Sequence, residues 1–165
     1  MKQRKPTRLK NFNYSLVGYY FITICAHNHL ELFGSISEEI TILNKIGKIV
    51  EQKLHSITEI YNDAVIDDCY TIMPNHLHFI LIINKPNEED TNRTKMYVSK
   101  IIQLFKSACT KEIRNEHNMS GKIWQKSYYD RVIRTETELQ NIRKYIAQNP
   151  LAWHLEKSTP ENLEL

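Results

Sequence analysis

The run His76–Ile83 (HLHFILII) constrains the fold of this chain more than any other segment. Its side chains are apolar apart from the two histidines at its start, which is typical of a central β-strand. The segment Tyr19–Ala26 (YYFITICA) is rich in aromatic and β-branched residues and predicts a second, mostly buried strand. The fold is therefore expected to be built around a buried sheet.

The rest of the chain predicts the elements that complete this sheet and cover it. Leu30–Ile36 and Ala64–Met73 are expected to be strands. Apolar residues at helical spacing predict helices over 44–55, with 40–43 leading into it, and over 98–116. A third helix is expected to begin at Thr135, with Glu138 completing a capping box, and to end at Pro150. The order β-β-α-β-β-α-α indicates an α+β sandwich, with helices packed on a largely antiparallel sheet.

The length of 165 residues suits a single domain, 1–165. Within it we expect a basic N-terminal arm over 1–14, a mobile loop over 84–95 and a tail over 151–165. No apolar stretch approaches the ~20 residues that span a bilayer, and the first residues do not resemble a signal peptide. Cys25, Cys69 and Cys109 form no C-x-x-C pair, which favours free thiols in a reducing compartment. We therefore expect a soluble, cytoplasmic protein.

The net charge of +3 is unevenly distributed along the chain. Residues 1–30 carry five basic and no acidic side chains, residues 31–90 carry a net charge of −7, and residues 91–145 carry +7. Two basic blocks around an acidic one favour a polarised surface that could bind a polyanion. Ordinary solvated helix faces would give a similar distribution.

The sharpest candidate for chemistry is Met73-Pro74-Asn75-His76-Leu77-His78, at the start of the most apolar strand. Side chains two apart on a strand share a face, so His76 and His78 are expected to point the same way. Two neighbouring neutral imidazoles make a good pair of ligands for a divalent metal. Two half-buried histidines that only pack on the sheet would show the same short pattern.

A second candidate is Tyr145-Ile146-Ala147-Gln148-Asn149-Pro150 on the last predicted helix. Tyr145 and Asn149 are four residues apart and share a helix face, with Gln148 close by. A tyrosine hydroxyl can act as a nucleophile when it is activated, and a carboxamide oxygen could complete a metal site begun by two histidines. A tyrosine at this position could equally be a packing residue.

A third candidate, Ile123–Arg134, interleaves two arginines and a lysine with three large aromatic side chains. Such a segment could contact bases and phosphates, or fill the core from the edge of the sheet. Its Tyr128 and Tyr129 are alternative nucleophiles, although neither is followed four residues later by an amide on a helix. A second histidine pair, His27-Asn28-His29, has a polar middle residue in a predicted turn and is interpreted as surface.

Taken together, these segments resemble the single-tyrosine HUH transposases, named for their histidine–hydrophobic–histidine motif, and in particular the REP-associated tyrosine transposases within the IS200-like group. The similarity is spread over blocks in the same order along most of the chain: Gly18–Cys25, Met73–Phe79, Phe105-Lys106-Ser107, Trp124-Gln125, Tyr128–Arg134, Tyr145-Ile146 and Asn149-Pro150.

The resemblance implies a ferredoxin/RRM-like sandwich and a metal-dependent nuclease. His76 and His78 match the family's histidine ligands for Mg²⁺ or Mn²⁺, and Tyr145 matches its catalytic tyrosine. Asn149 corresponds to the carboxamide ligand, with Gln148 as the fallback. The implied substrate is single-stranded DNA beside a hairpin, which the tyrosine would cleave through a 5′-phosphotyrosine link, with possible rejoining of the strands. The family includes monomers and homodimers, and the sequence does not decide between them.

The basic side chains expected to contact DNA lie in the N-terminal arm, the second predicted helix and the segments around the tyrosine. They are Lys2, Arg4, Lys5, Arg8, Lys10, Lys106, Lys111, Arg114, Arg131, Arg134, Arg143 and Lys144. Arg143 or Lys144 could also help to activate Tyr145. Two other functions remain open from the sequence: a catalytically inactive protein that binds hairpin nucleic acid, and a metal enzyme of a different class.

Overall fold

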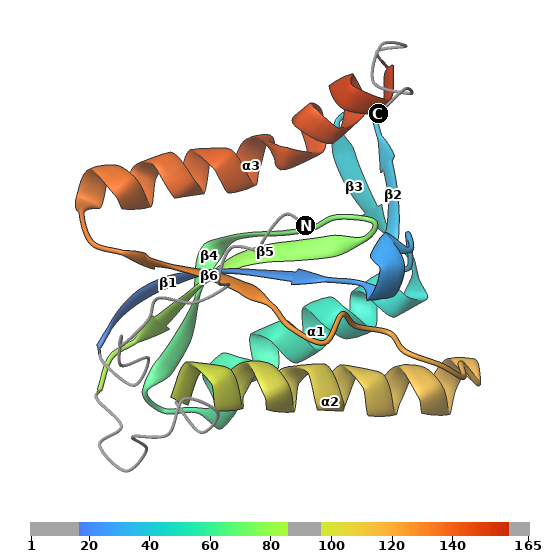
Figure 1. Ribbon diagram of the computed structural model, residues 1–165, viewed down its shortest axis with the longest axis horizontal. Coiled ribbons are helices and arrows are strands. Elements are labelled where there is room, and N and C mark those ends of the chain that lie inside the picture. Colours follow the sequence, from blue (N-terminus) through green and yellow to red (C-terminus); the bar gives the residue numbers. More distant parts are fainter. Residues whose placement is uncertain (1–16, 86–96, 159–165) are drawn as a thin grey trace, which may run out of the picture.

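The computed structural model describes residues 17–85 and 97–158, and its centre is a four-stranded antiparallel sheet in the order β4-β5-β1-β6 (Figure 1). The strands are β1 (Gly18–Cys25), β4 (Ala64–Ile72), β5 (His76–Ile83) and β6 (Tyr129–Ile133). The apolar strands β1 and β5 occupy the two central positions, where both faces of the sheet are covered. The expectation that His76–Ile83 forms a central strand is confirmed.

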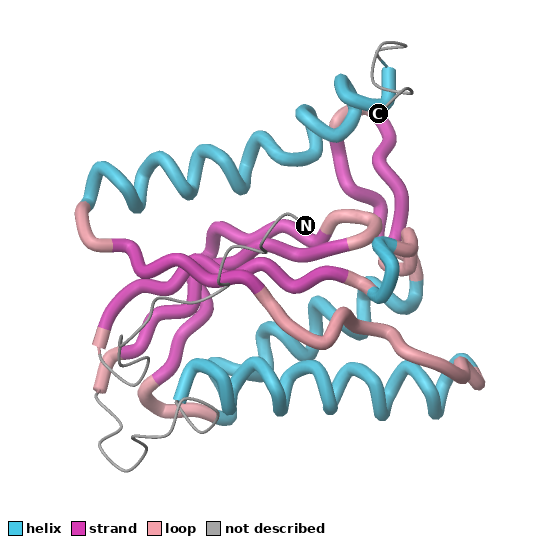
Figure 2. Tube along the Cα trace, in the orientation of Figure 1, coloured by secondary structure: helices cyan, strands magenta, loops and turns pink. Residues whose placement is uncertain are grey.

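Helices cover both faces of this sheet and give the molecule three layers (Figure 2). Helices α1 (Lys45–Ile60) and α2 (Tyr97–His117) lie on one face, and α3 (Glu136–Ser158) crosses the other (Figure 1). The predicted α+β sandwich is therefore confirmed. In the part of the chain that the structure describes, none of the helices has the length and apolar character needed to cross a membrane.

The alternation of side chains along β1 and β5 builds a different interior on each face. Tyr20, Ile22 and Ile24 point with Leu77, Phe79, Leu81 and Ile83 into the main core beneath α1 and α2. The opposite face carries a smaller cluster against α3, formed by Ile80, Ile133, Leu139 and Ile146. His76 and His78 belong to this second face by the same alternation, so the smaller core places α3 above the two histidines.

The segment before α1 differs from the expectation. Ile40–Leu43 does not lead into the helix but forms strand β3, which pairs with β2 (Gly34–Ser37) in a separate two-stranded sheet. Only the second half of the predicted strand Leu30–Ile36 therefore pairs. The preceding turn is a short 3₁₀ helix, η1 (His27–His29), in which Asn28 has a φ of 52°. The helical spacing of apolar residues after position 44 gave no indication that Ile40–Leu43 pairs with β2 as a strand.

The end of α3 also differs, because the helix continues through Pro150 to Ser158 and includes the first part of the predicted tail. A proline inside a helix removes one backbone hydrogen bond and bends the axis, and Figure 1 shows α3 changing direction in its C-terminal third. Contacts made beyond the proline compensate, since the Trp153 ring lies 6.0 Å from the ring of His76. The predicted arm over 1–14 and most of the predicted loop over 84–95 lie outside the described residues.

Candidate metal and tyrosine site

His76 and His78 project side by side from β5 towards α3. Their ring centroids are 4.6 Å apart and their Nε2 atoms 3.1 Å apart. The other nitrogen of each ring has its own partner: Nδ1 of His76 lies 2.6 Å from the Asn75 side-chain oxygen, and Nδ1 of His78 lies 2.8 Å from the Thr23 hydroxyl. Partners on Nδ1 fix the ring orientation and leave Nε2 to face the site. The shared face predicted from the sequence is confirmed.

Both imidazoles are held in their neutral form. Burial lowers the pKa of His76 to about 4, with a smaller lowering from His29 and an opposing effect from a hydrogen bond with the Asn149 side chain. Burial also lowers the pKa of His78 to about 3, and the neighbouring His76 lowers it further. Neutral rings at pH 7 have lone pairs available for a cation, which is the state that a metal ligand requires.

Tyr145 reaches this pair of histidines from the opposite layer. Its ring centroid is 5.4 Å from that of His78 and 6.0 Å from that of Phe21, against which it packs edge-on. Phe21 in turn stacks on His78, with ring centroids 5.3 Å apart. Even so, Tyr145 keeps 51% of its surface exposed. The phenol is thus held beside the imidazoles and remains open to a substrate.

Helix α3 presents three residues to the histidines at intervals of four, which is one face of an α-helix. Tyr145 contacts His78, whereas the Asn149 side chain is hydrogen-bonded to His76 and Trp153 lies beside the same ring. Gln148, the fallback ligand, is exposed. The spacing of four residues from Tyr145 through Asn149 to Trp153 is visible in the sequence. Trp153 was not predicted to belong to this face because the helix was expected to end at Pro150.

The donor set that faces this space consists of two imidazole nitrogens and one carboxamide. Over residues 17–85 and 97–158, no group of three or more His, Cys, Asp or Glu side chains is arranged to hold a metal ion. Two histidines and an amide oxygen fit an open, exchangeable site for Mg²⁺ or Mn²⁺ better than a closed structural zinc site. The residues present therefore fit the cation that the sequence resemblance implies.

The family model for IS200-like transposases matches residues 19–149, which is most of the chain. The chain belongs to the IS200-like transposase family. The matched region contains both histidines, Tyr145, Asn149 and all of β1 except Gly18, whereas Trp153 lies beyond it.

One relative in sequence and two solved structures are also similar to this chain. An uncharacterised protein of Haemophilus influenzae is 34% identical over 163 residues, covering 91% of this chain and 89% of its own. A REP-associated tyrosine transposase, solved bound to a REP hairpin, shares the fold with a TM-score of 0.54 and 16% identity, over 88% of this chain and 73% of its own. A Deinococcus radiodurans protein described as a transposase matches with a TM-score of 0.50 and 14% identity, over 87% and 98%.

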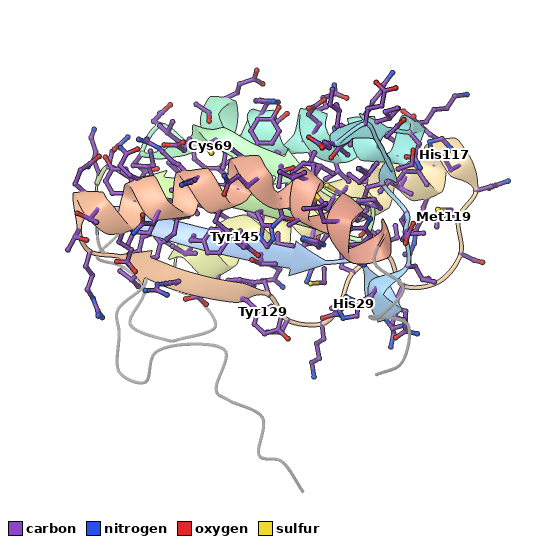
Figure 3. The ribbon with its side chains drawn as sticks, turned by 90° about the horizontal axis from the view of Figure 1, so that it is seen from above. His29, Cys69, His117, Met119, Tyr129 and Tyr145 are labelled. Carbon is purple, nitrogen blue, oxygen red and sulfur yellow. The ribbon has the colours of Figure 1, made fainter. Side chains whose placement is uncertain are left out.

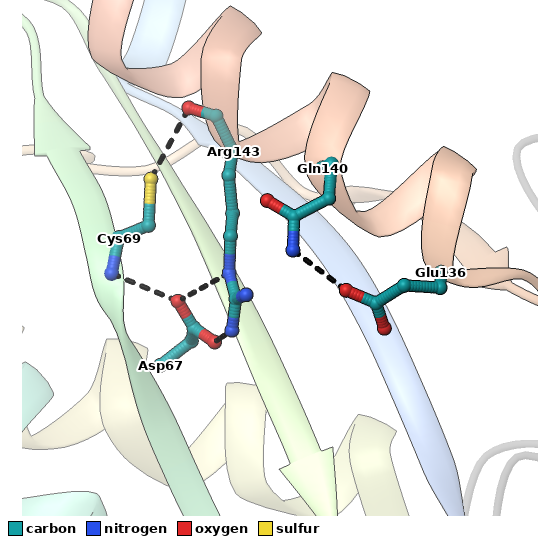
Figure 4. Close-up of polar contacts among 5 residues, drawn as sticks. All are labelled: Asp67, Cys69, Glu136, Gln140 and Arg143. Atoms are coloured by element: carbon teal, nitrogen blue, oxygen red, sulfur yellow. Dashed lines mark hydrogen bonds and ion pairs between the residues drawn. The ribbon is translucent and has the colours of Figure 1, made fainter.

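The site of this IS200-like transposase includes an ion pair that the sequence did not predict (Figure 4). Nη2 of Arg143 lies 2.5 Å from a carboxylate oxygen of Asp67 on β4, and the Cys69 thiol donates to the Arg143 carbonyl oxygen over 3.2 Å. Asp67 is buried, and a shift of register in β4 between Ile66 and Tyr70 marks its position. Arg143 thus joins α3 to the sheet, and its expected roles in contacting DNA or assisting Tyr145 stay predictions.

Two of the three predicted cations on α2 are bound to the loop that follows this helix. Nζ of Lys106 donates to the Gln125 carbonyl oxygen over 2.6 Å, and Arg114 donates to the Gly121 carbonyl oxygen over 2.8 Å. Lys106 is partly buried, and burial lowers its pKa. Lys111 is exposed. Lys106 and Arg114 therefore hold the loop against the helix.

The remaining predicted DNA contacts fall into two groups. Arg131 forms an ion pair with Glu138 over 2.6 Å with 69% of its side chain exposed, and Arg134 and Lys144 are exposed. The five cations of the N-terminal arm, Lys2, Arg4, Lys5, Arg8 and Lys10, lie outside the described residues. Contact with DNA therefore stays a prediction for all of them.

Figure 3, which looks down on α3, shows how the alternative candidates lie relative to Tyr145. Tyr128 is buried, with its hydroxyl 3.0 Å from that of Ser99, whereas Tyr129 on the edge strand β6 is 54% exposed. His29 is exposed, as expected of the second histidine pair, but it lies at the rim of the site, where its main-chain oxygen accepts from the Asn75 side chain over 3.4 Å.

Proposed function

We propose that this protein is a metal-dependent transposase and single-strand DNA endonuclease that uses Tyr145 as its nucleophile. The observation that carries the proposal is the half-exposed Tyr145 phenol beside two neutral histidines, the partly buried His76 and the buried His78, whose Nε2 atoms face each other. Membership of the IS200-like transposase family supports a reaction on DNA ends.

His76, His78 and Asn149 would hold Mg²⁺ or Mn²⁺ in this proposal. When bound, the cation would polarise the scissile phosphate and offset the negative charge that develops on it. The Thr23 hydroxyl can either donate to Nδ1 of His78 or accept from it. It can therefore stabilise the tautomer in which Nε2 of His78 keeps its lone pair for the cation.

The proposed cleavage is an exchange of one phosphate ester for another. The Tyr145 oxygen attacks the phosphorus and loses its proton, the bond from phosphorus to the 3′ oxygen breaks, and that oxygen is protonated to a free 3′-hydroxyl. The products are a 5′-phosphotyrosine and a 3′ end, so a later 3′-hydroxyl can reverse the step without an external energy source. Phe21 and His78 orient the phenol, which reduces the cost of reaching the attacking geometry.

The proposed substrate is single-stranded DNA next to a hairpin. The REP-associated tyrosine transposase that shares this fold was solved with a REP hairpin bound, and the basic side chains of α2 and β6 in this chain could bind such a DNA through its phosphates.

The deciding experiment is to incubate the protein with end-labelled hairpin DNA and Mn²⁺ and to separate the products under denaturing conditions. We expect a covalent protein–DNA adduct that Tyr145→Phe abolishes. Tyr129→Phe is the matched control, because it removes an equally exposed hydroxyl from the edge strand, and it should leave the adduct intact. Hairpin binding without any adduct would instead support a catalytically inactive binding protein.

A further inference from the structure

A large groove lies on the opposite side of the sheet from Tyr145. It has a volume of about 1580 Å³ and is formed between α2 and the loop that returns from α2 to β6. Figure 2 shows this loop running back along the helix. The loop is fastened there by the hydrogen bonds from Lys106 and Arg114, and by the Trp124 indole, which donates to the Lys106 carbonyl oxygen over 3.2 Å.

The charge of the groove is of one sign. Its described lining residues include five cations and no carboxylate, and the cations are Lys106, Lys111, Arg114, Lys122 and Lys126. The ammonium group of Lys106 is hydrogen-bonded to the loop. Lys122 and Lys126, by contrast, are exposed loop residues. A concave surface with this charge concentrates a polyanion and is suited to a phosphate backbone.

One end of the groove reaches the metal and tyrosine site through the main chain of β1. Gln125, which lines the groove, donates its main-chain N–H to the Cys25 carbonyl oxygen over 3.0 Å, and Cys25 is the register partner of His76. The Gln125 side chain also lies 3.0 Å from Nε2 of His29 at the rim of the site. The groove and the site are therefore neighbours at the same end of the sheet.

An exposed aromatic side chain lies along the same path. Tyr129 lines the groove, pairs with Thr23 across β1 and β6, and is 54% exposed. Residues opposite each other in an antiparallel pair share a face of the sheet, so Tyr129 lies on the face that carries His78. Exposed aromatics beside cationic grooves are the usual platforms on which unpaired bases stack.

We propose that this groove binds the single-stranded segment of DNA that continues from the cleavage point, with Lys122 and Lys126 on its phosphates and Tyr129 under a base. This inference rests on the function proposed above and extends it by assigning a path to the strand outside the site. The unpaired strand is favoured over the hairpin stem because the cations of the groove adjoin an exposed stacking surface, Tyr129, on the edge strand between the groove and the face that carries His78.

The test compares the binding of two DNAs, a hairpin with a single-stranded flank and the same hairpin without it. We expect the double variant Lys122→Ala/Lys126→Ala to lose at least tenfold in affinity for the flanked hairpin and little for the bare one. Its dependence of log affinity on log salt should become shallower by about 0.7 for each phosphate contact removed. Tyr129→Leu should weaken only the flanked complex. The matched control Lys45→Ala/Lys48→Ala removes two exposed cations from α1, outside the groove.

The outcomes separate this inference from the proposed function. Equal losses for both DNAs would assign the groove to the hairpin stem and overturn the inference, as would unchanged binding of the flanked hairpin. If the wild-type protein forms no covalent adduct while the double variant still loses affinity only for the flanked hairpin, the proposed nuclease activity is overturned. The binding of the single strand in the groove is then retained. Thermal unfolding of each variant confirms that the fold is unchanged.

Discussion

Arg143 on α3 binds the buried carboxylate of Asp67 on β4, and this pair joins the helix that carries Tyr145 to the sheet that carries the histidines. Asp67 also accepts from the Cys69 main-chain N–H over 2.9 Å, so its carboxylate is engaged from both sides (Figure 4). The hydrogen bond with Asp67 raises the pKa of Arg143, so the guanidinium keeps its charge in this contact. The orientation of α3, and with it of Tyr145, depends on this contact.

We expect Arg143→Met to destabilise the fold because it leaves the Asp67 carboxylate buried without its cation. The loss should be about 2 kcal/mol, below the 3–5 kcal/mol typical of a fully buried pair, because 36% of the Arg143 side chain is exposed. Chemical denaturation measures this change, and Lys144→Met is the control on an exposed neighbour. Arg143→Met should reduce the cleavage rate by a larger factor than it reduces hairpin affinity. Equal stability of Arg143→Met and Lys144→Met would contradict the role of the ion pair.

Gly47→Ala should destabilise the protein although alanine is the better helix former by about 1 kcal/mol. A Cβ at this position would lie 2.0 Å from the Phe33 carbonyl oxygen, which also accepts from the Asn44 N–H. Forcing α1 away from this backbone should cost about 1–3 kcal/mol. Thermal unfolding tests the expectation, with Lys48→Ala on the exposed side of the same helix as the control. A more stable Gly47→Ala protein would show that propensity dominates here.

The start of α3 should be sensitive to its cap. The Thr135 hydroxyl accepts from the Glu138 N–H over 3.1 Å, and Glu138 accepts from the Arg134 N–H over 2.9 Å. The Thr135 cap expected from the sequence is confirmed, but Glu138 reaches back to the N–H of Arg134 and not to that of Thr135, so the second half of the expected capping box differs. Thr135→Ala should therefore cost about 1 kcal/mol of unfolding free energy, measured by denaturant titration. Thr137→Ala, two residues further along the chain, provides the comparison for this loss of stability.

The same cap should give a pH-dependent contribution to stability. Hydrogen bonds from the Arg134 N–H and the Arg131 side chain lower the pKa of Glu138. A carboxyl group with a lowered pKa stabilises the folded state above its unfolded pKa of about 4.3 and loses this effect as the pH falls through the folded value. Wild type should therefore melt above Glu138→Gln at pH 7, and the difference should disappear in acid. A difference that persisted there would exclude ionisation as its cause.

The hydrogen bond from Thr23 to His78 offers a test of the proposed metal site. Thr23→Val removes the partner of the His78 Nδ1 atom and should lower Mn²⁺ affinity or the cleavage rate by about 10–100-fold. His76→Ala or His78→Ala should abolish cleavage but leave hairpin binding intact. Thr71→Val is the matched control, since Thr71 pairs with His78 from the other side but its hydroxyl points to the Met73 sulfur. Cleavage by the histidine variants in the presence of a chelator would exclude the metal.

Local patterns were enough to predict much of the fold and the centre of the site. The apolar strands β1 and β5, and the helices α1 and α2, lie close to where periodicity predicts them. The hairpin β2–β3 and the continuation of α3 beyond Pro150 were missed. Both depend on contacts between segments, which override short-range propensity.

By itself the sequence determined which side chains could share a face: the strand period of two pairs His76 with His78, and the helix period pairs Tyr145 with Asn149. These periods are properties of the backbone and need no information about neighbours. Only the tertiary structure decided that Arg143 binds Asp67, that Trp153 lies beside His76 and that Lys106 holds a loop. The reason is that the partner of a long side chain is set by whichever distant segment packs against it, which no local pattern records.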